Sequence, residues 1–251
     1  MTAMREDELE YYIRDLLQVD RFRDYCPNGL QVEGTREIRT IVSGVTASQA
    51  LLDAAIEANA DAVLVHHGYF WRNEDARIVG MKRNRIATLI QHGISLFAYH
   101  LPLDAHPALG NNAQLASHLG FSIDSWFGEQ NIAVQGHLDL SMPLNSLVEK
   151  VGVGLGRTPL AIGREDKVIR KIAWCSGAAQ DYFSEAVSLG VDAFLTGEIS
   201  EHSVHISRET GVAFISAGHH ATERFGIQAL GEHLKKQFDV CHHFIDIYNP
   251  V

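Results

Sequence analysis

The sequence contains few cysteines and few prolines, and both shortages narrow the class of protein. Its cysteines, Cys26, Cys175 and Cys241, are widely spaced and form no CxxC motif. An odd and scattered set of cysteines argues against a disulfide framework and suits a reducing compartment. Only 6 prolines occur among 251 residues and no segment is of low complexity, so a disordered chain is not expected.

Long apolar runs are also missing from the sequence. No stretch approaches the roughly 18 apolar residues that a transmembrane helix needs. Residues 1–19 are acidic and amphipathic, whereas a signal peptide is basic and then apolar. We therefore expect a soluble, cytoplasmic protein with no membrane partner.

Positive charge is scarce, because 21 lysine and arginine residues stand against 31 aspartate and glutamate residues and the formal net charge is −10. This balance argues against a general affinity for DNA, RNA or anionic membranes. An acidic chain can still hold a phosphate group where a bound metal ion inverts the local field. A small nucleotide-like partner therefore stays compatible with the charge.

What the sequence does contain is an internal repeat. Residues 38–68 and 169–199 align without a gap at a constant offset of 131, with identical pairs such as Asp61 and Asp192. Chance similarity between two α/β segments would produce part of this match, but the unbroken register favours duplication. A chain of 251 residues with 46% hydrophobic residues fits one large α/β unit or two smaller domains. The repeat favours two related halves.

Each copy of the repeat has the pattern strand, helix, strand. In the first copy, apolar runs at residues 39–45 and 61–67 flank residues 48–59, where apolar residues recur at helical spacing. This pattern predicts a right-handed βαβ unit with parallel strands. A helix is expected at residues 5–18, and a strand, a helix and a strand are expected within residues 126–168. The predicted fold class is α/β, with two related α/β domains.

Residues that can bind metal ions gather where the predicted strands end. In parallel α/β sheets, ligands collect beyond the carboxyl ends of the strands. The strand ends and the segments just beyond them contain His66, His67, His100, Asp104, His219, His220 and Glu223. Their shared location at one edge of each sheet is more informative than any single pair.

The residue types favour a site for two divalent metal ions. Imidazole and carboxylate groups together suit Zn, Fe, Mn, Co or Ni. Adjacent residues leave a strand in opposite directions, so His66 and His67 are expected to bind different ions. His219 and Glu223 are four residues apart and would share one face of a helix. A bridging Glu223, with Asp104 on one ion and His219 on the other, leaves positions open for water and substrate.

Ordinary structural roles explain each of these patterns taken alone. A histidine pair at a strand end is more often a surface or core feature. A His-x-x-x-Glu pair is usually exposed, and an aspartate in a Pro-Leu-Asp loop is usually a turn or a helix cap. In the second copy, Glu198, His202 and His205 either line the cleft beside the ligands or lie in a solvated loop. The shared location of the candidate ligands favours the metal site.

Five separated motifs resemble those of one family. The motifs are NGLQVEG (28–34), VHHGYFW (65–71), AYHLPLD (98–104), TGE (196–198) and SAGHHATERFG (216–226). Together they resemble the GTP cyclohydrolase I type 2 homologue family, in particular its short bacterial YbgI-like members. The resemblance spans nearly the whole chain.

The resemblance implies two similar α/β domains interleaved in one chain, and a homo-oligomer in the form of a hexameric toroid. On this basis we expect residues 1–125 plus 218–251 to form a first domain with most of the metal ligands. Residues 126–217 would form the second domain.

The resemblance also implies a dinuclear metal centre that faces the inner cavity of the toroid. Carried over residue by residue, the expected ligands are His66 and His67, one to each ion, Asp104 on one ion, His219 on the other, and Glu223 bridging. These are the positions reached from the strand ends.

The resulting functional hypothesis is a metal-dependent hydrolase that acts on a nucleotide or a damaged nucleobase, as in GTP cyclohydrolase chemistry. Metal ions would lower the pKa of a water to give the nucleophile, and His100 or His220 would transfer protons as catalytic residues. No glycine-rich phosphate-binding loop occurs in the sequence. The alternative is a non-catalytic metal-binding scaffold, carrier or insertion factor. A toroid around DNA is a third hypothesis, which the net charge opposes.

Overall fold

The computed structural model describes residues 4–251, and these residues divide into two units. Unit 1 comprises the described chain up to Leu103 together with Ile227–Tyr248, and unit 2 comprises Asp104–Gly226 together with Asn249–Val251. The chain passes between the units inside helix α4 (Leu101–Ala105) and again inside helix α10 (Arg224–Phe238). Each unit is therefore built from two separate segments of the chain.

The unit boundaries differ from those predicted at residues 125 and 217. Position 125 falls inside strand β5 (Phe121–Phe127), which pairs antiparallel with β6 (Ala133–Pro143) in unit 2. Helix α5 (Asn111–Leu119) packs its apolar side chains into the core of the same unit. As a consequence, Asp104, His219 and Glu223 all belong to unit 2, and the expectation that the first domain holds most of the ligands does not match these boundaries.

Unit 1 contains a mostly parallel sheet with the strand order β1-β4-β3-β2-β11. β11, β2, β3 and β4 run parallel, and β1 pairs antiparallel with β4. The strands are β1 (Gly29–Val32), β2 (Thr40–Thr46), β3 (Ala62–His67), β4 (Ser95–Ala98) and β11 (Cys241–Phe244).

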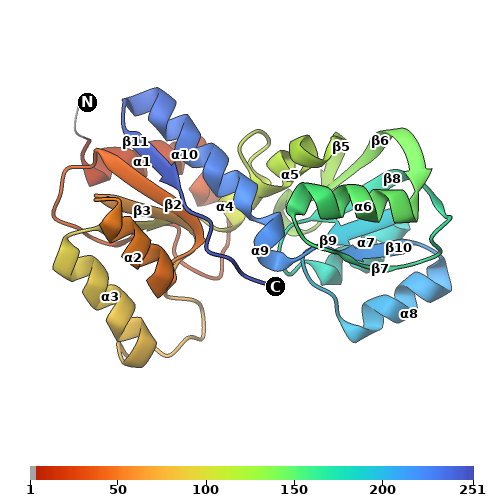
Figure 1. The fold of residues 1–251 in the computed structure, drawn as a ribbon, viewed down its shortest axis with the longest axis horizontal. Coiled ribbons are helices and arrows are strands. Elements are labelled where there is room, and N and C mark those ends of the chain that lie inside the picture. The colour runs from red at the N-terminus through yellow and green to blue at the C-terminus, as the bar shows by residue number, and fades with distance from the viewer. Residues whose placement is uncertain (1–3) are drawn as a thin grey trace. The chain divides into compact units, whose positions relative to one another are not determined.

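Helices cover both faces of the unit 1 sheet, with α2 (Gln49–Glu57) and α3 (Gly80–His92) on one face and α1 (Glu6–Leu16) and α10 on the other (Figure 1). A short 3-10 helix, η1 (Val19–Arg21), follows α1. Helix α2 starts where the Ser48 side chain accepts a hydrogen bond from a backbone N–H of the first turn. Its apolar residues pack with those of α3 against the buried valines of β2 and β3. The near-continuous burial of β2 and β3 is what a parallel sheet covered on both faces requires.

Unit 2 contains a sheet with the strand order β5-β6-β8-β9-β10-β7. β8, β9 and β10 run parallel, whereas β6 pairs antiparallel with β8 and β7 pairs antiparallel with β10. Its further strands are β7 (Leu160–Ile162), β8 (Val168–Cys175), β9 (Ala193–Thr196) and β10 (Ala213–Ser216). Its further helices are η2 (Glu129–Asn131), α6 (Leu144–Leu155), η3 (Gln180–Tyr182), α7 (Phe183–Ser188), α8 (Glu201–Thr210) and α9 (His219–Thr222).

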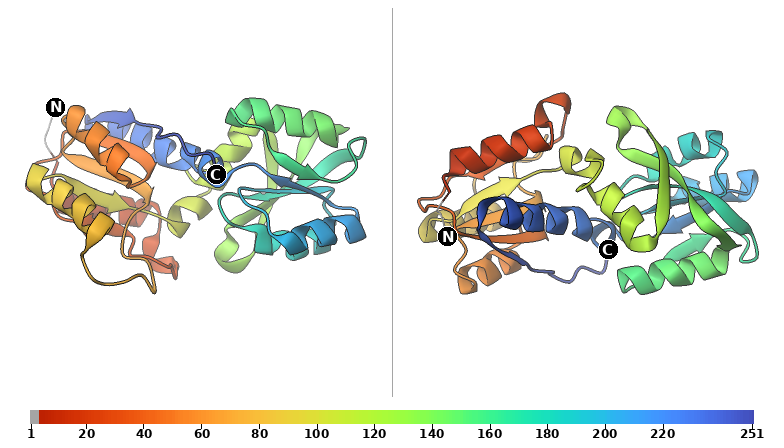
Figure 2. Two further views of the ribbon diagram at one scale, coloured as in Figure 1. Left: turned by 60° about the horizontal axis from the view of Figure 1, so that its bottom comes forward. Right: turned by 90° about the horizontal axis from the view of Figure 1, so that it is seen from above.

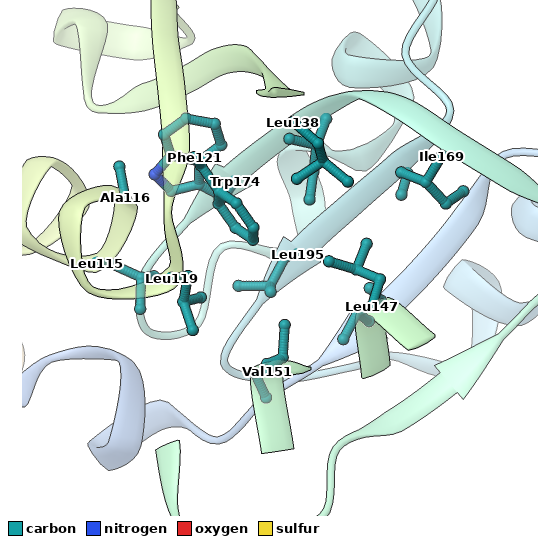
Figure 3. Packing of buried hydrophobic residues seen from close by; sticks show 14 of the residues in the cluster. Leu115, Ala116, Leu119, Phe121, Leu138, Leu147, Val151, Ile169, Trp174 and Leu195 are labelled. Carbon is teal, nitrogen blue, oxygen red and sulfur yellow. The ribbon is translucent and has the colours of Figure 1, made fainter. Parts of the chain in front are cut away.

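The sheet of unit 2 lies between α6 on one face and α8 on the other (Figure 2). Leucine and valine side chains of α5 and α6 converge on Trp174 and Leu195 in the core of this unit (Figure 3). Trp174 is fully buried, and its indole N–H donates to the carbonyl oxygen of Asn112 at 3.0 Å. Because the ring fills the core and its polar atom is paired, truncation to alanine would cost about 3–5 kcal/mol.

The strands of the two units pair in equivalent registers within their own sheets. Ile41 pairs with Ala62 in unit 1, and Ile172 pairs with Ala193 in unit 2, each 131 positions further along the chain. Asp61 Oδ2 accepts from the backbone N–H groups of Arg39 and Thr40 at 2.9 and 3.0 Å. Asp192 accepts from the two equivalent N–H groups, both at 2.9 Å. These matched contacts are consistent with an internal duplication and explain why this aspartate is the same in both copies.

Among residues 4–251, no helix combines the length and the apolar character needed to cross a membrane.

Candidate metal centre

His66 lies one residue before the end of β3 and is fully buried. Its Nδ1 lies 2.9 Å from the backbone carbonyl oxygen of Tyr99. Because a carbonyl oxygen can only accept a hydrogen bond, Nδ1 carries the proton and the neutral ring has its lone pair on Nε2. His66 is therefore in the tautomer that ligates a metal ion through Nε2.

His67 is the last residue of β3, and its Nδ1 lies 3.2 Å from the hydroxyl oxygen of Thr46 at the end of β2. The ring centroids of His66 and His67 are 4.6 Å apart. The alternation of side chains along a strand predicts opposite directions for these rings, whereas the structure places the two rings near each other.

His100 follows β4 by two residues, and a buried carboxylate holds it in place. Its Nδ1 lies 2.7 Å from Asp24 Oδ1, and its backbone N–H donates to Asn28 Oδ1 at 2.7 Å. Burial alone would raise the pKa of Asp24, but hydrogen bonds from His100, Asn28 and Leu101 outweigh burial and lower the pKa to about 2. The Asp24 carboxylate is therefore charged at neutral pH and fixes the His100 ring.

Two groups of donor atoms within unit 1 are close enough to share an ion. The donor atoms of His66, His67 and His100 lie within 4.8 Å of one another, and so do those of Asp24, Cys26 and His100. Burial and the nearby Asp24 charge raise the pKa of the Cys26 thiol to about 12. Because only the thiolate is a good ligand, the histidine group is the better candidate.

Asp104 is the first residue of unit 2 and is buried. Its Oδ1 accepts from Asn111 Nδ2 at 2.9 Å and from Ser176 Oγ at 3.1 Å. Asn111 in turn accepts from the backbone N–H of Gly226 through its own Oδ1 at 3.0 Å. Helix α5 and the loop after β8 thus hold the carboxylate in place. Asp104 is therefore a candidate metal ligand of unit 2.

His219 and Glu223 share one helical turn, as their spacing predicts. His219 begins the short helix α9, Glu223 follows its last residue, and His219 Nε2 lies 3.2 Å from Glu223 Oε2. Glu223 is buried although it is ionisable. A buried carboxylate beside an imidazole is the combination that a divalent ion stabilises.

Glu198 in the loop after β9 places its Oε1 2.7 Å from His219 Nδ1. Because a carboxylate can only accept, this contact puts the Nδ1 proton of His219 toward Glu198, as in a carboxylate–histidine–metal arrangement. Burial would lower the pKa of His219, but the hydrogen bonds and charges of Glu223 and Glu198 outweigh it and raise the pKa to about 9. An incoming metal ion would have to displace a proton from this ring.

The other histidines of the second copy separate into two classes. His202 and His205 are exposed on α8 and lie near the acidic side chains of Asp181 and Glu201, so they belong to the solvated face rather than beside the ligands. His220 is buried in α9, and its backbone N–H donates to the carbonyl oxygen of Val251 at 3.0 Å. Its role as a catalytic residue stays a prediction.

Sequence reasoning missed the residues that hold the candidate ligands in place. Thr46 offered a signal, because it directly follows the apolar run at residues 39–45, and in the structure it pairs with His67. Tyr99 acts through its backbone carbonyl, which no side-chain pattern marks. Asp24 lies 76 positions before His100, in a loop without periodicity.

The donor set fits divalent metal ions in each unit taken by itself. Unit 1 offers imidazole nitrogens from one strand end, and unit 2 offers an imidazole nitrogen together with two buried carboxylates. These are the donor types that Zn, Mn, Fe, Co and Ni take in proteins. Cys175 does not compete as a ligand: burial, together with the charges of Asp104 and Glu223, raises the pKa of its thiol well above the ordinary value.

Comparisons with known proteins agree over nearly the whole chain. The GTP cyclohydrolase 1 type 2 homolog of Pseudomonas aeruginosa is 56% identical over 237 residues, which cover 93% of this chain and 94% of that protein. The protein of the same name from Yersinia pestis is 53% identical over 251 residues, covering 98% and 100%. A solved structure of protein ybgI, whose function is given as unknown, matches with a TM-score of 0.95 and 49% identity, covering 99% of this chain and 100% of that one. Residues 4–250 match the sequence model of the Duf34/NIF3 (NGG1p interacting factor 3) family, and the chain belongs to this family.

Proposed function

We propose that this protein binds two divalent metal ions per protomer and is a metal-dependent hydrolase that acts on a nucleotide or a damaged nucleobase. The observation that carries the proposal is the anchoring of His66, His67 and His219. Each ring has its Nδ1 within hydrogen-bond distance of a fixed oxygen in its own unit. Anchoring at Nδ1 is the usual partner arrangement of histidines that ligate a metal through Nε2.

In this proposal the ligands would divide between the ions as the resemblance implies. His66 and His67 would bind one ion each, Asp104 would bind one of the ions and His219 the other, and Glu223 would bind both. The burial of Glu223 and Asp104 supports this assignment, because buried carboxylates need compensation by a cation or by donors.

Bound divalent ions supply an acidified water at neutral pH. The chain's own residues would then orient the substrate and move protons. Asp24 holds the His100 ring through a hydrogen bond of 2.7 Å, which suits His100 to exchange a proton at Nε2. His220 is the second candidate for this role. The names of the relatives favour a nucleotide ring as the hydrolysed group.

The test is turnover of a nucleotide panel that includes GTP and oxidised nucleobases, followed by chromatography and by release of formate. Protein loaded with Zn, Mn, Fe, Co or Ni should hydrolyse at least one member, and His67→Ala and Glu223→Ala should abolish the reaction. Turnover that persists in both variants would contradict the proposed mechanism.

The rival function is a metal carrier, scaffold or insertion factor. It predicts exchangeable metal and no turnover on the same panel, so the panel and a metal-transfer assay to an apo-acceptor separate the two functions. The hexameric toroid is likewise a proposal, which light scattering of the full chain tests by mass.

A further inference from the structure

Two aromatic side chains border the histidine cluster of unit 1 without taking part in its hydrogen bonds. The Trp71 ring centroid lies 5.0 Å from that of His100, with the rings at 84°, and 5.9 Å from that of His67. The Tyr25 ring lies 6.5 Å from His100, and 54% of the Tyr25 residue is exposed. Trp71 is half-buried, so both aromatic side chains keep accessible surface near His100.

The loop after β3 holds Trp71 in a defined position. The indole N–H donates to the carbonyl oxygen of Gly68 at 3.2 Å, and the backbone N–H donates to Glu74 Oε2 at 3.1 Å. The preceding residue, Phe70, has a φ of 64°, which costs a bulky residue roughly 1–2 kcal/mol. Strain of this kind concentrates at ligand-binding sites.

The Arg72 side chain is held next to the Tyr25 ring. The Arg72 guanidinium lies 5.5 Å from the centroid of the Tyr25 ring, and Arg72 Nη2 donates to the carbonyl oxygen of Asp24 at 2.8 Å. The backbone N–H of Arg72 donates to the carbonyl oxygen of Tyr25 at 2.6 Å. An arginine side chain has five N–H donors in a fixed fork, which suits a phosphate or carboxylate.

We propose that Trp71, Tyr25 and Arg72 form a substrate-recognition site in unit 1 for a planar nitrogen heterocycle that carries an anionic group. The heterocycle stacks on Trp71, and the anionic group pairs with Arg72, which Tyr25 supports by stacking. Because the Trp71 ring contacts His67 and His100, a heterocycle stacked on Trp71 would lie near the histidine cluster. Base–aromatic stacking and an arginine anchor together are the chemistry of nucleotide recognition. This inference rests on the proposed hydrolase function and specifies its substrate site.

The recognition site explains how an acidic chain without a glycine-rich loop holds an anionic substrate. The formal net charge is −10, so a phosphate needs a local cation. Arg72 is exposed and provides that cation beside the Tyr25 ring.

The test measures binding by calorimetry on the full, metal-loaded protein, with guanosine, GTP and inorganic triphosphate as probes. Trp71→Ala should weaken guanosine and GTP about tenfold, the scale of one base stacked on one aromatic ring, and leave triphosphate unchanged. Arg72→Gln should weaken GTP and triphosphate about tenfold and leave guanosine unchanged. Trp71→Phe should retain part of the guanosine affinity, because a smaller ring still stacks.

Matched controls separate recognition from general effects. Tyr11→Ala removes another exposed aromatic side chain, and Arg77→Gln removes another exposed arginine of unit 1. Neither should change the binding of any probe. Unchanged guanosine affinity in Trp71→Ala, or equal losses for guanosine and triphosphate, would overturn the proposal.

Metal content measured on the same samples separates this inference from the proposed function. Normal metal content with lost guanosine binding in Trp71→Ala supports the recognition site. Guanosine and GTP that fail to bind the metal-loaded wild type at millimolar concentration contradict the recognition site alone. Absent metal in the wild type contradicts the proposed function, and the selective loss in Trp71→Ala still tests the recognition site.

Discussion

Glu198 Oε1 lies 2.7 Å from His219 Nδ1, and Glu198 occupies the position in the second repeat that His67 occupies in the first. One copy thus places a candidate ligand at this strand end, and the other places the partner of a ligand. The common strand register brings both positions to the carboxyl edge of their sheets. A duplicated scaffold can therefore place different chemical groups at equivalent strand ends.

Replacing Glu198 tests whether this contact tunes a metal ligand. Glu198→Gln keeps an oxygen that accepts from His219 but removes the charge that makes the imidazole more basic. We expect the affinity for Zn or Mn to fall about 10- to 100-fold, measured by competition with a chromogenic chelator. Glu201→Gln is the matched control, because Glu201 is exposed on the next helix and pairs with His205. Equal metal affinities in Glu198→Gln and Glu201→Gln would mean that Glu198 has no role in metal binding.

Gly177 makes room for the Glu223 carboxylate. A Cβ at Gly177 would collide with Glu223 Oε1, and its φ of 68° is unfavourable for any other residue. Gly177 corresponds to Thr46 of the first copy, where the side chain instead contacts His67. A glycine is therefore needed at position 177 to accommodate the Glu223 carboxylate as well as to form the turn.

Gly177→Ala and Gly190→Ala separate strain from displacement of Glu223. Gly190 has a similar φ of 71°, but an added Cβ there meets no atom within 4 Å. Gly190→Ala should lower the free energy of unfolding by roughly 1–2 kcal/mol from strain alone. Gly177→Ala should cost roughly 1–3 kcal/mol more and should also lose metal. Urea denaturation and metal analysis give both values, and equal costs would contradict the contact.

His242 should make stability depend on pH. Its ring is buried, with Nε2 2.7 Å from Ser43 Oγ and Nδ1 2.9 Å from Glu232 Oε1. Burial lowers the pKa of His242 below its ordinary value of 6.5 even though Glu232 acts in the opposite direction. The unfolded chain then binds a proton at a pH where the folded chain does not, so protonation favours unfolding.

The direction of the pKa shift of His242 determines how stability depends on pH. The stabilising contribution is complete above pH 6.5, the ordinary pKa of histidine, and is lost as the pH falls toward the lower folded pKa. The slope from one such group is at most about 1.4 kcal/mol per pH unit. His242→Gln cannot titrate, so the stability difference between wild type and variant should shrink between pH 7.5 and pH 5.5. A constant difference in urea denaturation would show that His242 does not titrate in this range.

The sequence predicted the parallel core of each unit and the place of His66 and His67 at a strand end. Continuous apolar runs mark β3 and β9 because both faces of a parallel sheet are covered. The spacing of His219 and Glu223 predicted their shared helical turn, which is confirmed. The family resemblance is also confirmed.

Other features left no readable pattern in the sequence. Strand β5 lies at a sheet edge between two glycines and its polar–apolar alternation breaks after Asp124, so its pairing partner is decided by tertiary contacts. For that reason the predicted boundary at residue 125 fell inside it. The clamp of Asp24 on His100 joins segments far apart in sequence, and the anchoring of His66 uses a backbone carbonyl. Periodicity detects neither kind of contact.

The most direct test is the metal content per chain of protein purified without a chelator or a histidine tag. Wild type, Glu223→Ala and Glu209→Ala, an exposed acidic control on α8, should be compared by elemental analysis. We predict about two equivalents in the wild type and the control, and a sharp loss in Glu223→Ala with the fold retained. Wild-type protein that holds no stoichiometric metal after reconstitution with Zn, Mn, Fe, Co or Ni would contradict the two-ion site and the hydrolase built on it.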